Sequence, residues 1–182
     1  KAVTLAGIAA GNKVYDGTVN AELVTGGASI TGVIGGDDVS LDGSLGSGVF
    51  ANKSVGNGKT VTVTDLVLSG TDASNYTVAP LAGLTADITA KELTITGVSV
   101  ANKIYDGSTA VTLDTTTAAL VGGIGGDEVL LDSSLASGTS AEANVGTWSV
   151  LVTGFTLSGF DKDNYTVSQP TGLSVSITSA AP

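Results

Sequence analysis

The hydrophobic positions near the end of each half of the chain alternate with polar ones. Leucine, alanine and isoleucine occupy every second position of residues 84–88, and residues 173–177 repeat this with leucine, valine and isoleucine. A spacing of two places such side chains on one face of an extended strand. Because no long segment shows an apolar stripe with a spacing of 3.6 residues, the pattern predicts a chain built from strands.

The alternation slips by one residue inside two longer hydrophobic runs, 61–68 and 150–157. In the first run the apolar set moves from Val61 and Val63 to Leu66 and Leu68, and the second run slips at the same place. A recurring slip is typical of a β-bulge, in which one strand carries an extra residue. We therefore expect a bulge near Asp65 and at the matching position of the second run.

These patterns belong to one unit that occurs twice. Lys-Val-Tyr-Asp-Gly at 13–17 returns as Lys-Ile-Tyr-Asp-Gly at 103–107, and Asn-Tyr-Thr-Val at 75–78 returns at 164–167. The offset between the copies falls from 90 to 89 residues just after Val145-Gly146, which places the loss of one residue in a predicted turn. The sequence therefore predicts two units, residues 1–90 and 91–182.

The predicted fold class is all-β. Short strands separated by glycine-rich turns favour two tandem antiparallel β-sandwich modules of the immunoglobulin-like, Greek-key kind. Tyr76 and Tyr165 each follow a polar turn and open a strand, as a tyrosine in a tyrosine corner does, and an ordinary half-buried strand tyrosine is the alternative. A β-grasp-like module, which needs one helix, is the alternative fold.

The junction between the units contains no flexible linker. Residues 84–96 include neither glycine nor proline, and the inward-facing positions change from even to odd numbers across 89–92. One extended segment is therefore expected to leave the first core and enter the second directly. We expect two units joined end to end with restricted bending.

Composition excludes several classes of function. The net charge is −10, the seven basic residues are all lysines, and the chain has no Arg, His, Cys or Met. Without His or Cys there is no Ser-His-Asp or Cys-His system, no conventional zinc site and no disulfide. An acidic chain without arginine is not expected to bind nucleic acid. No apolar run is long enough for a membrane span, and the missing Met at position 1 suggests a fragment of a longer chain.

Five motifs recur in the same order in both copies and resemble the YDG repeat of large secreted bacterial exoproteins of the filamentous-haemagglutinin and biofilm-adhesin type. Besides the signature around Tyr-Asp-Gly, they are a Gly-Asp step, a Val-Gly step, a Leu-Ser-Gly…Asn-Tyr element and a final strand, which reads Ala-Asp-Ile-Thr in the first copy and ends in Ile-Thr in both. The resemblance covers nearly the whole chain twice. The signature positions are Lys13, Tyr15, Asp16, Gly17, Asn75, Tyr76, Lys103, Tyr105, Asp106, Gly107, Asn164 and Tyr165.

The resemblance implies non-catalytic stalk or spacer units that extend a distal adhesive region of a surface adhesin, for cell attachment or for aggregation in a biofilm. It implies an extracellular location at the bacterial cell surface, and neighbouring repeats of the same chain as partners. The alternative function is that the repeats themselves bind extracellular polysaccharide or another adhesin copy. The family carries no catalytic residues to transfer, and we expect neither enzymatic activity nor direct membrane insertion.

The Tyr-Asp-Gly triplet itself is typical of a turn. In such a turn the aspartate accepts a hydrogen bond from its own backbone, and the glycine takes a positive φ. We expect this arrangement at residues 15–17 and 105–107, with the tyrosine ring covering the core. A ligand-reading loop is the alternative.

No cofactor is expected, although some carboxylates resemble calcium ligands. Asp161 and Asp163 look like the start of a calcium loop, and Asp72 and Asp87 are further candidates. This segment lacks the later glycine and glutamate of an EF-hand, so a solvated acidic turn is the favoured interpretation.

The paired acidic residues at 37–38 and 127–128 are not expected to act as glycosidase carboxylates. Adjacent residues of a strand point to opposite faces of the sheet, so they cannot flank one bond of a substrate. Lys13 and Lys103 also lie near asparagines, which raises the alternative of a Lys–Asn isopeptide crosslink.

Aromatic residues cluster in the sequence of the second copy only. Trp148, Phe155 and Phe160 lie within thirteen positions. An exposed group of this kind could bind sugar, which makes Trp148 the candidate for a glycan contact. Core filling is the favoured interpretation of all three.

Overall fold

The computed structural model describes residues 1–42 and 46–180. The chain forms two compact units, Lys1–Ala90 and Lys91–Pro182. In the described residues the helices are limited to two 3-10 turns, η1 (Ala73–Asn75) and η2 (Lys162–Asn164). The expectation of an all-β chain made of two tandem modules is confirmed, and the β-grasp alternative is wrong because it needs a longer helix. No helix among the described residues could cross a membrane.

The strands of the first unit are β1 (Ala2–Ala6), β2 (Ala9–Ala10), β3 (Lys13–Val14), β4 (Asn20–Ala21), β5 (Leu23–Val24), β6 (Ser29–Thr31), β7 (Ser40–Asp42), β8 (Ser47–Phe50), β9 (Gly56–Thr64), β10 (Val67–Ser69), β11 (Thr77–Val78) and β12 (Thr85–Thr89). They form a five-stranded sheet in the order β3-β12-β9-β8-β4 and a three-stranded sheet in the order β11-β1-β6. Two further pairs, β10-β7 and β2-β5, complete the unit.

The strands of the second unit are β13 (Lys91–Thr96), β14 (Ser99–Val100), β15 (Lys103–Ile104), β16 (Ala110–Val111), β17 (Leu113–Asp114), β18 (Ala119–Val121), β19 (Leu130–Asp132), β20 (Ser137–Ser140), β21 (Gly146–Thr153), β22 (Thr156–Ser158), β23 (Tyr165–Val167) and β24 (Leu173–Thr178). Their sheets repeat those of the first unit, with the orders β15-β24-β21-β20-β16 and β18-β13-β23 and the pairs β19-β22 and β14-β17.

Antiparallel pairs predominate, but each unit also contains two parallel pairs. The first strand of the unit runs parallel to the strand before the last, as β1 with β11 and β13 with β23. The last strand runs parallel to the strand of the Tyr-Asp-Gly motif, as β12 with β3 and β24 with β15. Alternation alone did not predict these pairs, because a period of two is the same in either direction.

The alternating residues of the last strands lie in the core, as expected. Ala86 and Ile88 are buried in the first unit. In the second unit Val175 and Ile177 belong to one buried cluster with Val150, Val152 and Phe155. Burial of these apolar groups is the main force that holds each unit together.

The repeated phase slip is a break between two strands and not a bulge, which corrects the prediction. Strand β9 ends at Thr64 and β10 begins at Val67, and Asp65 between them has a φ of 59°. At the matching position Gly154 has a φ of 89°, and a Cβ there would lie 2.0 Å from the carbonyl oxygen of Leu135. The backbone therefore leaves the sheet at this residue in both units.

The one-residue difference in length lies inside a strand and not in a turn, which is a second correction. Strand β9 has nine residues where β21 has eight. The register of β12 against β9 shifts between Ala86 and Ile88, whereas β24 pairs with β21 without interruption. The extra residue of the first unit is thus absorbed as a β-bulge.

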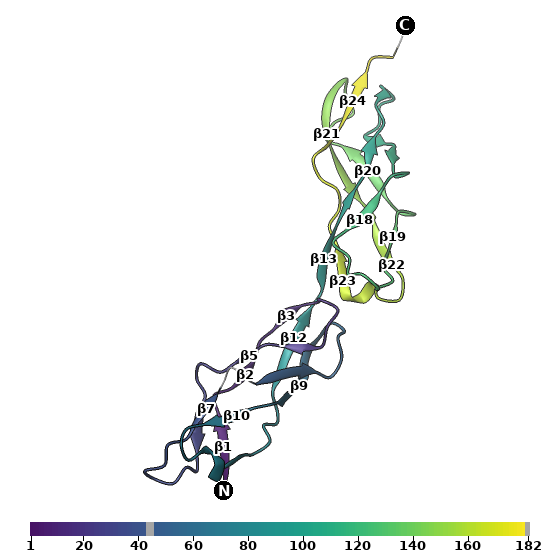
Figure 1. Ribbon diagram of the computed structural model, residues 1–182. Coiled ribbons are helices and arrows are strands. Elements are labelled where there is room, and N and C mark those ends of the chain that lie inside the picture. The colour runs from purple at the N-terminus through teal and green to yellow at the C-terminus, as the bar shows by residue number, and fades with distance from the viewer. Residues whose placement is uncertain (43–45, 181–182) are drawn as a thin grey trace. The chain divides into compact units, whose positions relative to one another are not determined.

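Each unit receives the chain at one of its ends and releases it at the other (Figure 1). In the first unit the N-terminus and β1 lie at one end, and β3 and β12 lie at the opposite end. In the second unit β13 and β23 lie at one end, and β21 and β24 lie at the other. Ala90 alone separates β12 from β13 along the chain.

Candidate functional site

The Lys13 ammonium lies inside the loop that follows β3. Its Nζ donates hydrogen bonds to Asp16 Oδ1 at 2.7 Å, to the Thr18 carbonyl oxygen at 2.9 Å and to Thr18 Oγ1 at 3.1 Å. Asp16 Oδ1 also accepts a hydrogen bond from the Thr18 backbone N–H at 2.9 Å. Partial burial raises the pKa of Asp16, but the hydrogen bonds from Lys13 and Thr18 outweigh it and hold the pKa below its ordinary value. The expected turn is present, and the lysine closes it.

Lys103 closes the matching loop of the second unit with one more bond. Its Nζ donates to Asp106 Oδ1 at 2.8 Å, to the Ser108 carbonyl oxygen at 2.7 Å and to the Ala110 carbonyl oxygen at 2.9 Å. The hydrogen bond from Lys103 is the largest cause that lowers the pKa of Asp106 to about 2. The Lys103 side chain is only 15% exposed, so its charge is held by oxygens of its own loop.

The asparagine that precedes each lysine contacts the last strand of its unit. Asn12 Oδ1 accepts a hydrogen bond from the Asp87 backbone N–H at 2.8 Å, and Asn102 Oδ1 accepts one from the Ser176 N–H at 2.9 Å. Asp87 Oδ1 in turn accepts from the Gly58 N–H at 2.7 Å. These side chains satisfy backbone donors that the sheet leaves free at the bulge of the first unit and at the corresponding place in the second.

The backbone N–H of the tyrosine in each motif bonds the final residue of the last strand, β12 or β24. The Tyr15 N–H donates to the Thr89 carbonyl oxygen, and the Tyr105 N–H donates to that of Thr178, both at 2.8 Å. Tyr15 is 1% exposed, and Lys53 Nζ lies 5.8 Å from the centroid of its ring. Tyr105 is 45% exposed, so the expectation that the ring covers the core does not hold in the second unit.

The motif is therefore a clasp between the start and the end of each unit. We use the name clasp for residues 12–18 with 85–89, and for residues 102–108 with 173–178. Gly17 and Gly107 both adopt a φ of 77°, which permits the reversal of the loop. Sequence reasoning treated the motif as a local turn and missed its bonds to the last strand. The available signal was that both segments recur together in each copy.

A second contact recurs at the opposite end of each unit. The Tyr76 hydroxyl donates to Asp37 Oδ2 at 2.6 Å and accepts a hydrogen bond from the Ile34 N–H at 3.0 Å. The bond to the Asp37 carboxylate raises the pKa of Tyr76. Tyr76 is buried, so it is not an ordinary half-buried strand residue.

Tyr165 makes the same two contacts in the second unit. Its hydroxyl donates to Asp127 Oδ2 at 2.7 Å and accepts from the Ile124 N–H at 3.1 Å. In a tyrosine corner the backbone partner lies a few residues upstream, whereas Ile124 lies 41 residues upstream. The structure therefore corrects the tyrosine-corner prediction to a long-range hydroxyl clamp. Asn75 and Asn164, the other residues of this motif, end the turns η1 and η2.

The Leu-Ser-Gly glycines allow two loops to approach closely. In the first unit the Asp38 N–H donates to Asp72 Oδ2 at 2.9 Å, and the Asp72 N–H donates to the Asp38 carbonyl oxygen at 3.1 Å. A Cβ on Gly70, whose φ is 112°, would lie 2.3 Å from that oxygen. Only glycine fits here.

The second unit repeats this contact with a glutamate. The Glu128 N–H donates to Asp161 Oδ2 at 2.8 Å, and the Asp161 N–H donates to the Glu128 carbonyl oxygen at 3.0 Å. A Cβ on Gly159 would lie 2.4 Å from the same oxygen. The glycine of this motif is thus explained by contact between backbones.

The four calcium candidates have separate hydrogen-bonding partners. The Asp72 and Asp161 carboxylates each accept a bond from a loop N–H, Asp87 accepts from the Gly58 N–H, and Asp163 accepts from Lys162 Nζ at 2.8 Å. Within the described parts of the chain, no three His, Cys, Asp or Glu side chains are grouped as metal ligands would be. Calcium binding stays the alternative interpretation of these carboxylates.

The paired acidic residues lie in loops, so the argument from strand geometry does not apply to them. Asp37 and Asp38 fall between β6 and β7. The Asp37 carboxylate accepts from Tyr76, and Asp38 Oδ2 accepts from the Thr71 N–H at 3.1 Å. The two carboxylates are thus directed to different partners within their own unit.

The lysines and asparagines considered for an isopeptide crosslink are also bonded to different groups. Lys13 Nζ is directed to Asp16 and Thr18, whereas the Asn12 amide oxygen is directed to Asp87. Lys103 and Asn102 diverge in the same way. The structure does not bring these neighbouring pairs together.

The aromatic residues of the second unit have three different environments. Phe155 is buried in the core, and Trp148 packs against that core while its Nε1 donates to the Asn144 carbonyl oxygen at 2.8 Å. Phe160 is 88% exposed, so the core-filling interpretation fails for this residue. A glycan contact at Trp148 stays a prediction.

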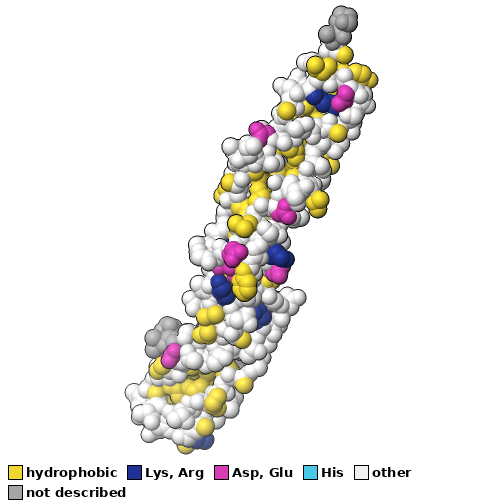
Figure 2. All heavy atoms as spheres, turned by 90° about the vertical axis from the view of Figure 1, so that its right-hand side faces the viewer, with side chains coloured by type: hydrophobic (Ala, Val, Ile, Leu, Met, Phe, Trp, Pro, Cys, Tyr) yellow, Lys and Arg dark blue, Asp and Glu magenta, His cyan; other side chains and the backbone are white. Residues whose placement is uncertain are grey.

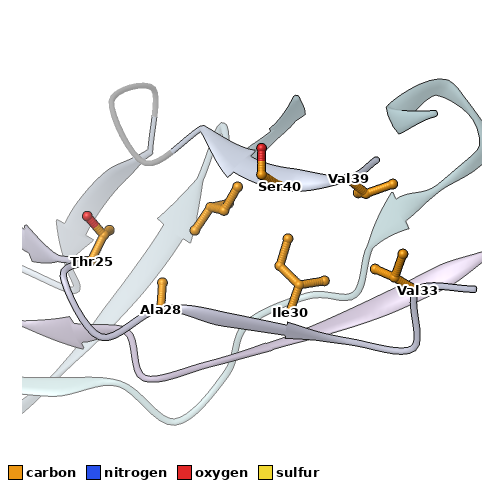
Figure 3. Close-up of a pocket in the computed structure, with 7 residues that line it drawn as sticks. Thr25, Ala28, Ile30, Val33, Val39 and Ser40 are labelled. Atoms are coloured by element: carbon orange, nitrogen blue, oxygen red, sulfur yellow. The ribbon is translucent and has the colours of Figure 1, made fainter. Parts of the chain in front are cut away.

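An open groove of about 580 Å³ lies between β6 and β7 of the first unit (Figure 3). Apolar side chains and two hydroxyl groups line it. Sequence reasoning did not identify it, because its residues come from separate segments and form no motif. The lining residues are Thr25, Ala28, Ile30, Val33, Val39, Ser40 and Leu41.

Comparison with known proteins gives one match, to a family. The sequence model of the YDG domain matches residues 1–83 and again residues 89–172. No curated protein and no solved structure matches the chain. The matched stretches end before β12 and β24 begin, although both strands belong to the clasps described above. Because the two matches cover most of the chain, the protein belongs to the YDG domain family and carries two copies of the domain.

Proposed function

We propose that the two YDG domains are non-catalytic spacer units in the stalk of a large secreted bacterial surface adhesin. In this role they hold a distal adhesive region away from the cell, for attachment or for aggregation in a biofilm. The observation that carries the proposal is the clasp. Its lysine, asparagine and aspartate side chains bond within their own unit, as expected of a motif that maintains a fold.

The path of the chain through each unit also supports a spacer. The first and last strands lie at opposite ends of the unit (Figure 1), and Ala90 alone joins β12 to β13. Within each unit the chain therefore advances from one end of the unit to the other. The connection between the two units contains no flexible linker.

The composition suits an extracellular location. A chain without cysteine can be exported unfolded, because no disulfide locks it on the way. Its net charge of −10 would limit adhesion between parallel stalks. On the face shown in Figure 2, the acidic side chains are scattered, and some of them lie beside lysines.

Small-angle X-ray scattering of the 182-residue chain tests the spacer role. The proposal expects a particle with a maximum dimension roughly twice that of one domain. The control is a variant with a flexible Gly-Ser segment inserted after Ala90, which should broaden the distribution of distances. A compact particle from the unmodified chain, with one unit folded back on the other, would overturn the proposal.

The alternative function, binding of extracellular polysaccharide or of a second copy, is favoured by one observation. Phe160 is 88% exposed on the second unit, and exposed aromatic rings stack on sugars. Binding to a glycan array that is lost in both Phe160→Ala and Trp148→Ala would support this alternative. Absence of glycan binding and of self-association at high concentration would contradict it.

A further inference from the structure

The strands that begin and end each unit are interior strands. Strand β1 lies between β11 and β6, and β12 lies between β9 and β3. In the second unit β13 lies between β23 and β18, and β24 lies between β21 and β15. Tension applied through the chain therefore acts on strands that have a bonded neighbour on each side, as β1 has β11 along residues 2–3 and β6 along residues 4–6.

The direction of the first pair decides how it responds to tension. From β11 the chain continues to β12 and leaves the unit, so tension pulls β11 toward its C-terminal end and β1 toward its N-terminal end. Because β1 and β11 run parallel, these pulls slide one strand along the other. The bonds cross that direction, as the Thr77 N–H to Lys1 and the Ala79 N–H to Val3 do at 2.9 Å. Such bonds must fail together and not in sequence.

The clasp also places the last strand, β12, in a parallel pair that tension loads in shear. Strand β12 pairs in parallel with β3 through Ile88 and Lys13 and through Thr89 and Val14. The Tyr15 N–H adds a bond to the carbonyl oxygen of Thr89 at 2.8 Å. Tension on the end of β12 is thus opposed by bonds to the motif and by the antiparallel ladder with β9.

We propose that each YDG domain bears tensile load. The clamps that hold the load in shear are the two parallel pairs of each unit, which are β1–β11 and β3–β12 in the first unit and β13–β23 and β15–β24 in the second. This role goes beyond the proposed spacer function, because a spacer can separate two parts without resisting force. Scattering and pulling experiments test the two proposals separately.

The two units should differ in strength. Strand β13 pairs with β23 at three positions, whereas β1 pairs with β11 at two. Strand β24 pairs with β21 at five consecutive positions, whereas the ladder of β12 with β9 has three and contains a bulge. The first unit should therefore unfold before the second under the same force.

Constant-force pulling of the whole chain through its two ends tests the proposal. It should unfold in two steps of about 30 nm each, since each unit has about ninety residues. Ala79→Pro removes the N–H that bonds Val3, and Ser168→Pro removes the N–H that bonds Leu93. Each variant should speed only the step of its own unit, by about fivefold for the one bond that Ala79→Pro removes and by at least as much for Ser168→Pro, which also removes the hydroxyl that bonds Glu92. The earlier step should be the one that Ala79→Pro changes.

A second pulling geometry leaves the clamps intact. The chain has no cysteine, so handles can be attached at Ser137→Cys and Thr153→Cys, which lie opposite each other in the antiparallel β20–β21 pair. Tension there opens the ladder one pair at a time. The second unit should yield at least about tenfold faster than when it is pulled through the chain ends at the same force. Equal rates in the two geometries would overturn the proposal, as would proline variants that unfold like the parent.

Discussion

Asn12 Oδ1 accepts a hydrogen bond of 2.8 Å from the backbone N–H of Asp87, which lies 75 residues further along the chain. Asn102 makes the equivalent contact with the Ser176 N–H. The residue that opens the signature motif thus holds the strand that ends the domain. A domain cut off before this strand would lose the main partner of its own motif.

Replacing the lysine of the clasp should destabilise the second unit. Lys103→Met removes the ammonium that donates to the Asp106 carboxylate and to two loop carbonyl oxygens, and we expect the free energy of unfolding to fall by about 1–2 kcal/mol. Lys162→Met is the control, because Lys162 makes an exposed ion pair with Asp163 and should change it by no more than about 0.5 kcal/mol. Urea unfolding followed by fluorescence of the single tryptophan, Trp148, measures both. Equal effects would contradict the role of the clasp.

The clasp should also contribute a pH dependence. The pKa of Asp106 is lowered to about 2 from an ordinary value of 3.8. A pKa depressed by folding stabilises the fold above the unfolded pKa, and this stabilisation is lost as the pH falls through the folded pKa. The melting temperature of the parent should therefore exceed that of Asp106→Asn at about pH 5, and the difference should shrink between about pH 4 and pH 2. A difference that is constant across this range would rule out the assignment.

The Leu-Ser-Gly glycine should tolerate no side chain. Gly159→Ala places a Cβ 2.4 Å from the Glu128 carbonyl oxygen at a φ of 104°, and we expect the free energy of unfolding to fall by at least about 2 kcal/mol. Gly125→Ala is the matched control, since a Cβ there meets no atom within 4 Å. Thermal unfolding of the two variants gives the comparison. Similar melting temperatures for both would show that the two loops separate more readily than the structure implies.

The contribution of the hydroxyl clamp to stability can be measured by removing the hydroxyl oxygen of Tyr165. Tyr165→Phe deletes the donor to Asp127 and the acceptor of the Ile124 N–H, with an expected loss of about 1–2 kcal/mol. Tyr105→Phe is the control, because Tyr105 is 45% exposed, and its effect should stay within about 0.5 kcal/mol. Urea unfolding distinguishes the two, and a Tyr165→Phe variant as stable as the parent would exclude a stabilising role for the clamp.

The alternating pattern was sufficient to predict the all-β class and the buried face of the last strand at Ala86 and Ile88. It could not predict strand direction, because parallel and antiparallel neighbours present the same alternation. It also could not separate a bulge from a break between strands. At Asp65 that distinction depends on a positive φ, which a hydrophobic pattern does not contain.

The turn at Tyr15-Asp16-Gly17 followed from local chemistry, because an aspartate can bond its own backbone and a glycine can take a positive φ. The hydrogen-bonding partners of Lys13 and Asn12 could not be predicted from local chemistry. They depend on which distant strand is adjacent, and only the topology determines that. The repeat constrains such predictions only indirectly, because a contact proposed in one copy must also be possible in the other.

Native-state hydrogen exchange tests the central claim, that the signature motif holds the last strand, most directly. The Tyr105 and Ser176 amides donate to Thr178 and to Asn102 across the clasp of the second unit. They should exchange as slowly as the core amide of Val150, by global unfolding only, and Asn102→Ala should speed exchange at Ser176. Fast exchange at both amides in the parent chain, with Val150 still protected, would contradict the account.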